Sequence, residues 1–335
     1  MNTFIRTTSC IMLVVFLILS ISAKGRGGEM DTIRKPIIAG TWYPADPAQL
    51  RADIEGYLAG ARVDAVNGKV MGIISPHAGY VYSGQVAAHA YKAAQGSEFD
   101  AVILIGPSHR ASFKGASIYN GEGYETPLGV IPVDKTLAGN IAAYSGGVVS
   151  LVPDDGLPEN SLEIQVPLLQ VALGTIPFVP ILMGTQDLGT CRAVADAIIR
   201  AAGDGRVLVI ASSDFSHYHS YNRAVEMDSV ALEYIEKMDA EGFLRGVEGG
   251  RYEACGAGPV VVTTMVARAM GADNARILEY MNSGDITGDK NGVVGYAAVV
   301  LYKKDADGVD QRGNVEDELD ETGKRSTPYN STEEY

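Results

Sequence analysis

The chain is poor in the residues that build several common kinds of site. Its 335 residues include only three cysteines, one tryptophan and five histidines. The cysteines, Cys10, Cys191 and Cys255, form no CxxC pair, which argues against a disulfide framework and against a zinc ribbon. No GxGxxG motif follows a strand-like run and no GxxxxGK(S/T) motif is present. Neither a dinucleotide site nor a P-loop nucleotide site is therefore expected.

Positive charge is also scarce, because the formal net charge is −14. A nucleic-acid partner needs a basic protein face to meet its phosphates, so no nucleic acid is expected to bind. Half of the charge falls on residues 305–335, where ten acidic and three basic residues give −7. Such a segment cannot bury enough apolar surface to fold by itself. It predicts a disordered acidic tail that solvates the chain or, as the alternative, an acidic interaction tail.

The amino terminus has the layout of a targeting segment. One early cation, Arg6, precedes an apolar core at 10–19, small residues up to Ala23 and a flexible polar stretch. This core is short for a membrane-spanning helix, which favours a secretory signal peptide at 1–23, with an uncleaved membrane anchor as the alternative. We expect residues 24–34 to form a linker. In either case the folded part is expected to be exported, to a periplasmic or extracellular space that is oxidising.

Three of the five histidines stand just after a continuous apolar run. The runs and their histidines are 70–74 with His77, 101–105 with His109, and 207–211 with His217. Apolar runs that do not alternate with polar residues indicate strands buried on both faces, as in a parallel sheet. Ligands of such sheets bind beyond the carboxyl ends of the strands. Three imidazoles at one rim therefore favour a metal site or an acid/base site there over three structural histidines.

Strand-like and helix-like segments alternate between residues 35 and 304. The alternation predicts a single α/β domain over this range, with a largely parallel central sheet flanked by helices. Asp46, Asp134 and either Asp187 or Thr190 are expected to begin helices, and a short antiparallel insertion is expected to pair 117–119 with 129–133. Further segments are expected as helices at 83–94, 228–238 and 260–270, and as strands at 178–183, 275–280 and 295–302.

Four further residues stand out. Cys255 lies in a loop beside glycines, which let a backbone approach a bound group closely, so it is either a ligand or a buried structural cysteine. Thiolate and imidazole together suit iron, copper or zinc. Asp214 and His217 are candidates for a ligand, for a partner that orients a ligand, or for an acid/base pair. The only tryptophan, Trp42, lies in a loop, where it either plugs the core or forms a wall of the pocket.

Several motifs follow one another in a specific order between residues 37 and 302, with AGTWYP just ahead of the first. The motifs are SPHAGYVYSG at 75–84, GPSH at 106–109, SSDFSHY at 212–218, ACGAGP at 254–259 and NSGDITGD at 282–289. Together they resemble the MEMO family, whose prokaryotic members are called AmmeMemoRadiSam system protein B. That family is similar in fold to class III extradiol dioxygenases of the LigB type, which use non-haem iron. The resemblance therefore implies a LigB-dioxygenase-like fold.

The resemblance also implies a site. By its motifs the metal-binding positions fall on His77, His109 and Cys255, and Asp214 and His217 complete the pocket as the catalytic candidates. In the dioxygenase relatives the third ligand is a glutamate, and the residue that matches His217 acts as the base. A cysteine in the ligand position therefore sets this chain apart from the ring-cleaving enzymes.

The implied function is a dioxygenase-like, non-haem metal-dependent oxidoreductase that uses iron or copper, with zinc as another candidate metal. Two alternatives stay open: a non-catalytic module that binds a metal, a small molecule or a peptide, and a zinc-dependent hydrolase. The resemblance also implies an association with AmmeMemoRadiSam system partners. Two features depart from the family: Asn160 stands where EHSLE often carries a histidine, and most members lack an export signal.

Overall fold

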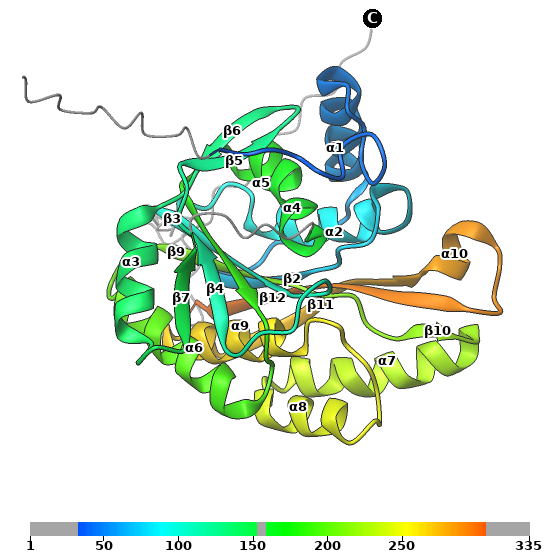
Figure 1. The fold of residues 1–335 in the computed structure, drawn as a ribbon. Helices are drawn as coiled ribbons and strands as arrows, with labels where there is room; N and C mark the ends of the chain where they lie inside the picture. Colours follow the sequence, from blue (N-terminus) through cyan, green and yellow to red (C-terminus); the bar gives the residue numbers. More distant parts are fainter. Residues whose placement is uncertain (1–32, 153–158, 306–335) are drawn as a thin grey trace, which may run out of the picture. The chain divides into compact units, whose positions relative to one another are not determined.

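The computed structural model describes residues 33–152 and 159–305. The expected signal peptide at 1–23, most of the expected linker and nearly all of the acidic tail lie outside the described residues. Within the described ranges, no helix is both long and apolar enough to cross a bilayer. These ranges form one mixed α/β domain with a large central sheet (Figure 1).

Nine strands make up the central sheet. They are β2 (Gly68–Ser75), β3 (Ala101–Pro107), β4 (Ala116–Tyr119), β7 (Val149–Val152), β8 (Phe178–Met183), β9 (Val207–Ser212), β10 (His217–His219), β11 (Asn274–Asn282) and β12 (Val293–Lys304). The spatial order is β10-β12-β2-β9-β3-β8-β4-β7, and β11 pairs with β12 beside this path.

The four central strands of the sheet are parallel, and the strands on either side of them run in the opposite direction. Strands β2, β9, β3 and β8 run in one direction, and every residue of β3, β8 and β9 is buried, as the unbroken apolar runs predicted. On one side β12 lies antiparallel to β2 and to β11, and on the other β4 lies antiparallel to β8. The α/β class is thus confirmed, with parallel pairing among the four central strands and again between β4 and β7 at one edge. A short connection, such as the one between β11 and β12, can join only antiparallel neighbours.

Helices cover both faces of this sheet (Figure 1). The long ones and their short companions are α1 (Pro47–Gly60), α2 (Tyr80–Ala94), α3 (Lys135–Tyr144), α4 (Asn160–Glu163), α5 (Gln165–Leu173), α6 (Leu188–Ala202), α7 (Tyr221–Glu236), α8 (Ala240–Glu248), α9 (Ala257–Ala269) and α10 (Ser283–Thr287). Helices α1, α2 and α5 contribute to one core cluster, and α3 and α6–α9 contribute to the other. Neither α8 nor α10 was predicted from the sequence.

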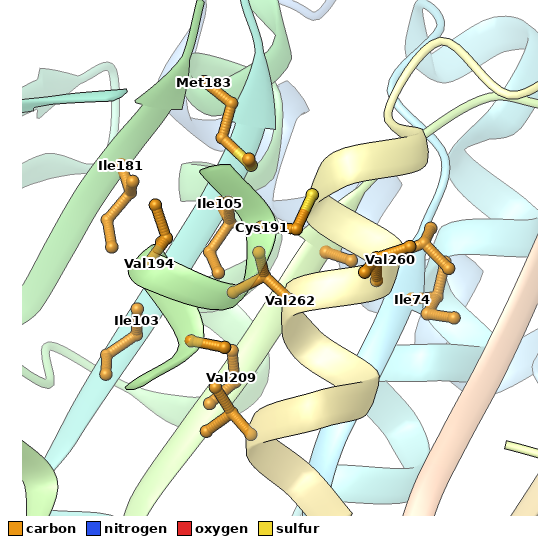
Figure 2. Close-up of a cluster of buried hydrophobic side chains, with 14 of the residues drawn as sticks. Ile74, Ile103, Ile105, Ile181, Met183, Cys191, Val194, Val209, Val260 and Val262 are labelled. Atoms are coloured by element: carbon orange, nitrogen blue, oxygen red, sulfur yellow. The ribbon is translucent and has the colours of Figure 1, made fainter. Parts of the chain in front are cut away.

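The two cores meet at the central strands. Along β3, Val102 and Leu104 pack into the first cluster, while Ile103 and Ile105 pack into the second, because successive side chains of a strand point to opposite faces. Figure 2 shows part of the second cluster, where Ile103 and Ile105 lie near side chains of α6 and α9. A sheet buried on both sides holds its strand ends rigidly, which is what a site at those ends requires.

The expected helix starts are confirmed by their capping bonds. The side chains of Asp46, Asp134 and Asp187 accept hydrogen bonds from backbone N–H groups three residues further on, at 2.8, 2.9 and 3.0 Å. Such bonds satisfy N–H groups that have no partner within the helix. Of the two starts proposed for α6, Asp187 is therefore the correct one.

The expected pairing of 117–119 with 129–133 is wrong. Strand β4 joins the large sheet between β8 and β7, while β6 (Gly129–Pro132) pairs with β5 (Gly123–Thr126). A two-residue connection closes that hairpin locally, so β6 takes its nearest neighbour in sequence as its partner. Strand β1 (Ile33–Arg34), which the sequence assigned to the linker, pairs with β5 and completes a small three-stranded sheet.

Candidate metal centre

The structure brings His77, His109 and Cys255 together. Their ligand atoms all lie within 4.8 Å of one another. His77 and His109 follow β2 and β3, which flank β9 in parallel, so both strands end at the same edge of the sheet. Cys255 precedes α9, and its Sγ lies 3.1 Å from the Nε2 atom of His77. The two imidazole rings are 5.1 Å apart and nearly perpendicular.

His77 has one ring nitrogen held by the protein and one that faces Cys255. Its Nδ1 lies 3.0 Å from the Ser212 hydroxyl oxygen, and that hydroxyl donates to the Ser161 carbonyl at 2.6 Å. Ser212 therefore accepts from His77, which places the imidazole proton on Nδ1 and the lone pair on Nε2. Burial, with the nearby His109, lowers the pKa of His77 to about 3. A neutral ring with a directed lone pair is the form that binds a metal.

A carboxylate holds the Nδ1 atom of His109, as the Ser212 hydroxyl holds that of His77. Its Nδ1 lies 3.0 Å from Oε1 of Glu159, and its backbone N–H donates to Oε2 at 2.6 Å. Burial by itself raises the pKa of Glu159, but the hydrogen bonds from His109 and from the Ser161 N–H outweigh it and lower that pKa to about 2. The buried carboxylate thus stays ionised and leaves the Nε2 lone pair of His109 free. Ligating histidines usually have such a partner.

Sequence reasoning did not assign Glu159 to the site. The residue caps α4, where its Oε1 also accepts from the Ser161 N–H at 2.9 Å. Fifty positions separate it from His109, and only the folding of α4 against the end of β3 joins them. The available signal was its place as the first glutamate of ENSLE, the motif in which Asn160 had already been noted.

Cys255 lies in an environment that opposes a free thiolate. Burial, followed by the charge of Asp214, raises the pKa of its thiol. Its Sγ accepts the Asp214 N–H at 3.3 Å, and the Asp214 carboxylate accepts the His77 N–H at 2.7 Å. Burial likewise raises the pKa of Asp214 to about 6. A bound cation reverses this preference, because a coordinating thiol loses its proton.

The loop of Cys255 depends on a glycine. A Cβ atom on Gly256 would lie 2.4 Å from the carbonyl oxygen of Ser212, so only glycine allows the loop to approach β9 this closely. The Gly256 N–H donates to the Ser213 hydroxyl at 3.0 Å. The two imidazoles and one thiol that meet here fit iron, copper or zinc better than hard ions that prefer oxygen.

A cavity of about 480 Å³ opens above the two histidines. Asp214 and His217 also line it, so both catalytic candidates lie at the expected pocket. Trp42 is half-buried: it forms part of the cavity wall and also packs against the first core cluster. The remaining lining residues are Thr41, Ala78, Gly79, Val81, Tyr82, Arg110, Asn160, Tyr218, Val294 and Tyr296.

His217 lies on the cavity wall, outside the group of three ligand atoms. Its backbone N–H donates to Oε2 of Glu253 at 2.9 Å, and the other oxygen of Glu253 lies 2.9 Å from Nε2 of His219. Burial raises the pKa of Glu253, but the hydrogen bonds from His219 and His217 lower it more. Glu253 and His219 were not assigned to the site from the sequence. They join the strand of His217 to the loop of Cys255.

A family model described as Memo-like protein matches residues 34–300. The chain belongs to the MEMO family. A MEMO1 family protein of Methanopyrus kandleri is 37% identical over 285 residues, which cover 81% of this chain and 99% of that protein. A MEMO1 family protein of Methanosarcina acetivorans is 36% identical over 275 residues, covering 80% and 99%. One of Nitrosopumilus maritimus is 34% identical over 273 residues, covering 80% and 98%.

One solved structure extends the likeness to the fold of this MEMO-family chain. An uncharacterized protein from Escherichia coli K12 matches with a TM-score of 0.50 at 14% identity, covering 70% of this chain and 100% of that one. Identity this low carries information on the fold alone. The likeness to ring-cleaving dioxygenases remains a prediction.

Asn160, which the resemblance marked as a departure from the family's motif, lies at the site. The residue begins α4, is buried, and lines the cavity. An amide can donate and accept hydrogen bonds but does not exchange protons near neutral pH as an imidazole does. In this chain the only imidazole on the cavity wall that is outside the ligand group, among the described residues, is that of His217.

Proposed function

We propose that this MEMO-family chain is a non-haem metal-dependent oxidoreductase, dioxygenase-like, with iron or copper held by His77, His109 and Cys255. The observation that carries the proposal is that two histidines, each with its Nδ1 atom held by the protein, and Cys255 bring their ligand atoms within 4.8 Å of one another beside a cavity that both histidines line. When bound, iron or copper would supply electron transfer and open coordination positions for oxygen or substrate.

The chain's own groups have separate tasks in this proposal. Ser212 and Glu159 hold the protons on the Nδ1 atoms of the two histidine ligands. His217, on the cavity wall, takes or gives a proton at an imidazole nitrogen. Asp214, which lines the same cavity, orients this imidazole or stabilises its positive charge. The aromatic side chains of Trp42 and its neighbours limit the water that reaches the metal.

Metal analysis and oxygen uptake test this function. Protein purified without air should contain iron or copper, lose it in His77→Ala and Cys255→Ser, and consume oxygen with substrate. His217→Ala should retain the metal and lose most of its turnover, a loss of roughly 10²- to 10⁴-fold for a general acid or base. Asp214→Asn should change turnover in the same direction by less.

Two other results would replace this proposal. Zinc alone, with ester or amide cleavage and no oxygen uptake, would favour the zinc hydrolase, since three protein ligands and a water form a catalytic zinc site. A bound metal without turnover of any substrate would favour a module that binds a metal, a small molecule or a peptide.

We also propose that the chain is exported to a periplasmic or extracellular space and works with AmmeMemoRadiSam system partners. The layout of residues 1–23 supports export, and family membership supports the partners. Sequencing the amino terminus of protein from fractionated cells distinguishes a cleaved signal from a retained anchor. Recovery of the intact chain from the cytoplasm would refute export, and failure of tagged protein to capture a radical-SAM partner would refute the association.

A further inference from the structure

One wall of the cavity belongs to the segment that enters the domain, residues 34–43, and this segment is held by a buried carboxylate. Thr41 and Trp42 of the segment line the cavity. We propose that Glu163, at the end of α4, is the positioning residue that keeps this wall closed over the cavity and so sets access to it. The proposal adds a role outside the ligand group and does not depend on which metal binds there.

The contacts of Glu163 are unusually concentrated on this one segment. Its side chain is 1% exposed. Four donors converge on its two oxygens, and all of them come from residues 34–43. They are the Arg34 guanidinium at 2.9 Å, the backbone N–H groups of Ile37 at 2.9 Å and Ile38 at 3.0 Å, and the Tyr43 hydroxyl at 2.9 Å. These donors lie on both sides of Trp42 in the sequence.

The segment has a second attachment, at Trp42 itself. The Trp42 carbonyl accepts the N–H of Tyr80 at 2.8 Å, and Tyr80 begins α2 three residues after His77. Within the segment, the Trp42 N–H donates to the Ile38 carbonyl at 2.9 Å. The loop is therefore held through its backbone by α2 and through four donors by Glu163. Of these two attachments, only the one to Glu163 depends on a single side chain.

Helix α4 links this wall to the ligands. Glu159, at its amino end, holds His109, while Glu163, at its carboxyl end, holds the segment of Trp42. Asn160, between them, faces the cavity. The four-residue helix thus sets the position of a metal ligand with one buried carboxylate and the position of the wall that contains Trp42 with another.

Replacing Glu163 by glutamine would be enough to loosen the wall. A carboxylate oxygen can only accept, whereas a glutamine would aim an N–H₂ group at donors that need an acceptor. Buried donors left without an acceptor would draw the segment toward water. Trp42 is the only tryptophan of the chain, so its fluorescence reports the position of this wall without interference.

The test compares Glu163→Gln with a matched control, Glu125→Gln, in the full chain. Glu125 pairs with Lys35, the neighbour of Arg34, but that pair is exposed and lies away from the cavity. We expect acrylamide to quench Trp42 emission at least about twofold more strongly in Glu163→Gln than in wild type, because the local opening exposes the ring. In the control, the quenching should equal that of wild type. Far-UV circular dichroism should match wild type in both.

Two further measurements keep the proposal falsifiable. Tyr43→Phe removes one donor and leaves the others, so it should shift the quenching in the same direction by less, even if Glu163→Gln fails to fold. Cobalt(II) affinity, measured by chelator competition, should stay within about threefold of wild type in Glu163→Gln, because the carboxylate touches no ligand atom. The quenching of Trp42 emission by bound cobalt should fall, because the loosened wall moves Trp42 away from the metal.

Unchanged acrylamide quenching in Tyr43→Phe and in any folded Glu163→Gln would overturn the proposal and leave Glu163 a purely structural anchor. A cobalt affinity that falls in step with the quenching would also overturn it, because the residue would then support the ligands and not the wall. If wild type binds neither cobalt nor iron nor copper, the proposed metal function fails, but the acrylamide comparison still decides the role of Glu163.

Discussion

Cys191 and Cys255 lie in two regions that treat the same side chain differently. Cys191 is fully buried in α6 among apolar side chains, as Figure 2 shows, and its Sγ lies near the carbonyl of Gln186 at 3.5 Å. Cys255 lies in a glycine-containing loop, with Sγ 3.1 Å from an imidazole nitrogen. Burial raises the pKa of both thiols, that of Cys191 to about 12.

The comparison teaches that burial does not identify a ligand. Both thiols are desolvated, so a raised pKa describes them equally. Only Cys255 has another potential metal ligand beside it, the His77 imidazole, whose lone pair is directed by the protein. A single residue even touches both regions, because the backbone carbonyl of Gln186 lies 3.5 Å from the Cys191 Sγ atom and its side-chain Nε2 donates to the Cys255 carbonyl at 3.0 Å. The presence of neighbouring metal-ligating atoms, and not the local polarity, distinguishes the candidate ligand from the structural cysteine.

The largest expected effect is the difference in metal affinity between variants of these two cysteines. Cys255→Ser should weaken the binding of iron(II), copper(I) and zinc(II) by about 100-fold or more, at least the upper end of what losing a supporting partner of a ligand costs. Cys191→Ala should leave affinity unchanged and cost about 1 kcal/mol of folding stability from lost packing. Anaerobic chelator competition measures the first quantity. Equal affinities in the two variants would remove Cys255 from the site.

Metal addition should stabilise the proteins that retain Cys255 against thermal unfolding, and should not stabilise Cys255→Ser. At about 100 times its dissociation constant, a metal that binds only the folded chain adds about 2.7 kcal/mol, which raises the melting temperature by about 5–10 °C. Wild type and Cys191→Ala should both show this increase, and Cys255→Ser should lose most of it. Thermal scans of apo protein with and without metal test this. An equal increase in all three proteins would indicate a metal site elsewhere.

Glu159→Gln should weaken metal binding by about 10- to 100-fold without removing a ligand, since it disturbs the proton on Nδ1 of His109. The matched control is Glu163→Gln on the same helix, whose carboxylate holds the entering segment. Chelator competition on both variants makes the measurement. An effect on affinity from Glu163→Gln as large as that from Glu159→Gln would mean that α4 acts as one support and not as two.

The smallest expected effect is that of Ser212→Ala, which removes the acceptor for Nδ1 of His77. Metal affinity should fall by about 10-fold, the lower end of the range for such partners. Ser145→Ala removes another buried serine with a hydrogen bond, to the Ala142 carbonyl, far from the cavity, and serves as the control. If both substitutions change affinity equally, the Ser212 bond has no specific role in directing the imidazole.

Local signals in the sequence determined much of the frame. The unbroken apolar runs marked the buried strands, aspartates marked the starts of three helices, and histidines followed the strands that end at one rim. These features depend on a few adjacent residues, so a single sequence contains them. The motifs around them also placed the chain in the MEMO family, which the comparisons confirm.

Helix α8 shows where local signals fail. Gly242 and Gly246 lower the helix propensity of this segment, so its sequence does not predict a helix. In the fold a Cβ on Gly246 would lie 2.1 Å from the Tyr252 hydroxyl, so glycine is required for that ring to pack there. Phe243 and Leu244 are buried in the core, and this burial stabilises the helix against its propensity.

The sequence by itself determined which strands are buried, where the histidines and Cys255 stand relative to them, and the family. Only the tertiary structure decided that β2 and β3 both flank β9, that β4 joins the large sheet and not the expected insertion, and that Glu159 bonds to His109 while Glu163 bonds to the segment of Trp42. The physical reason is distance along the chain. Strand order and buried hydrogen bonds join residues tens to more than a hundred positions apart, and no local pattern specifies such a partner.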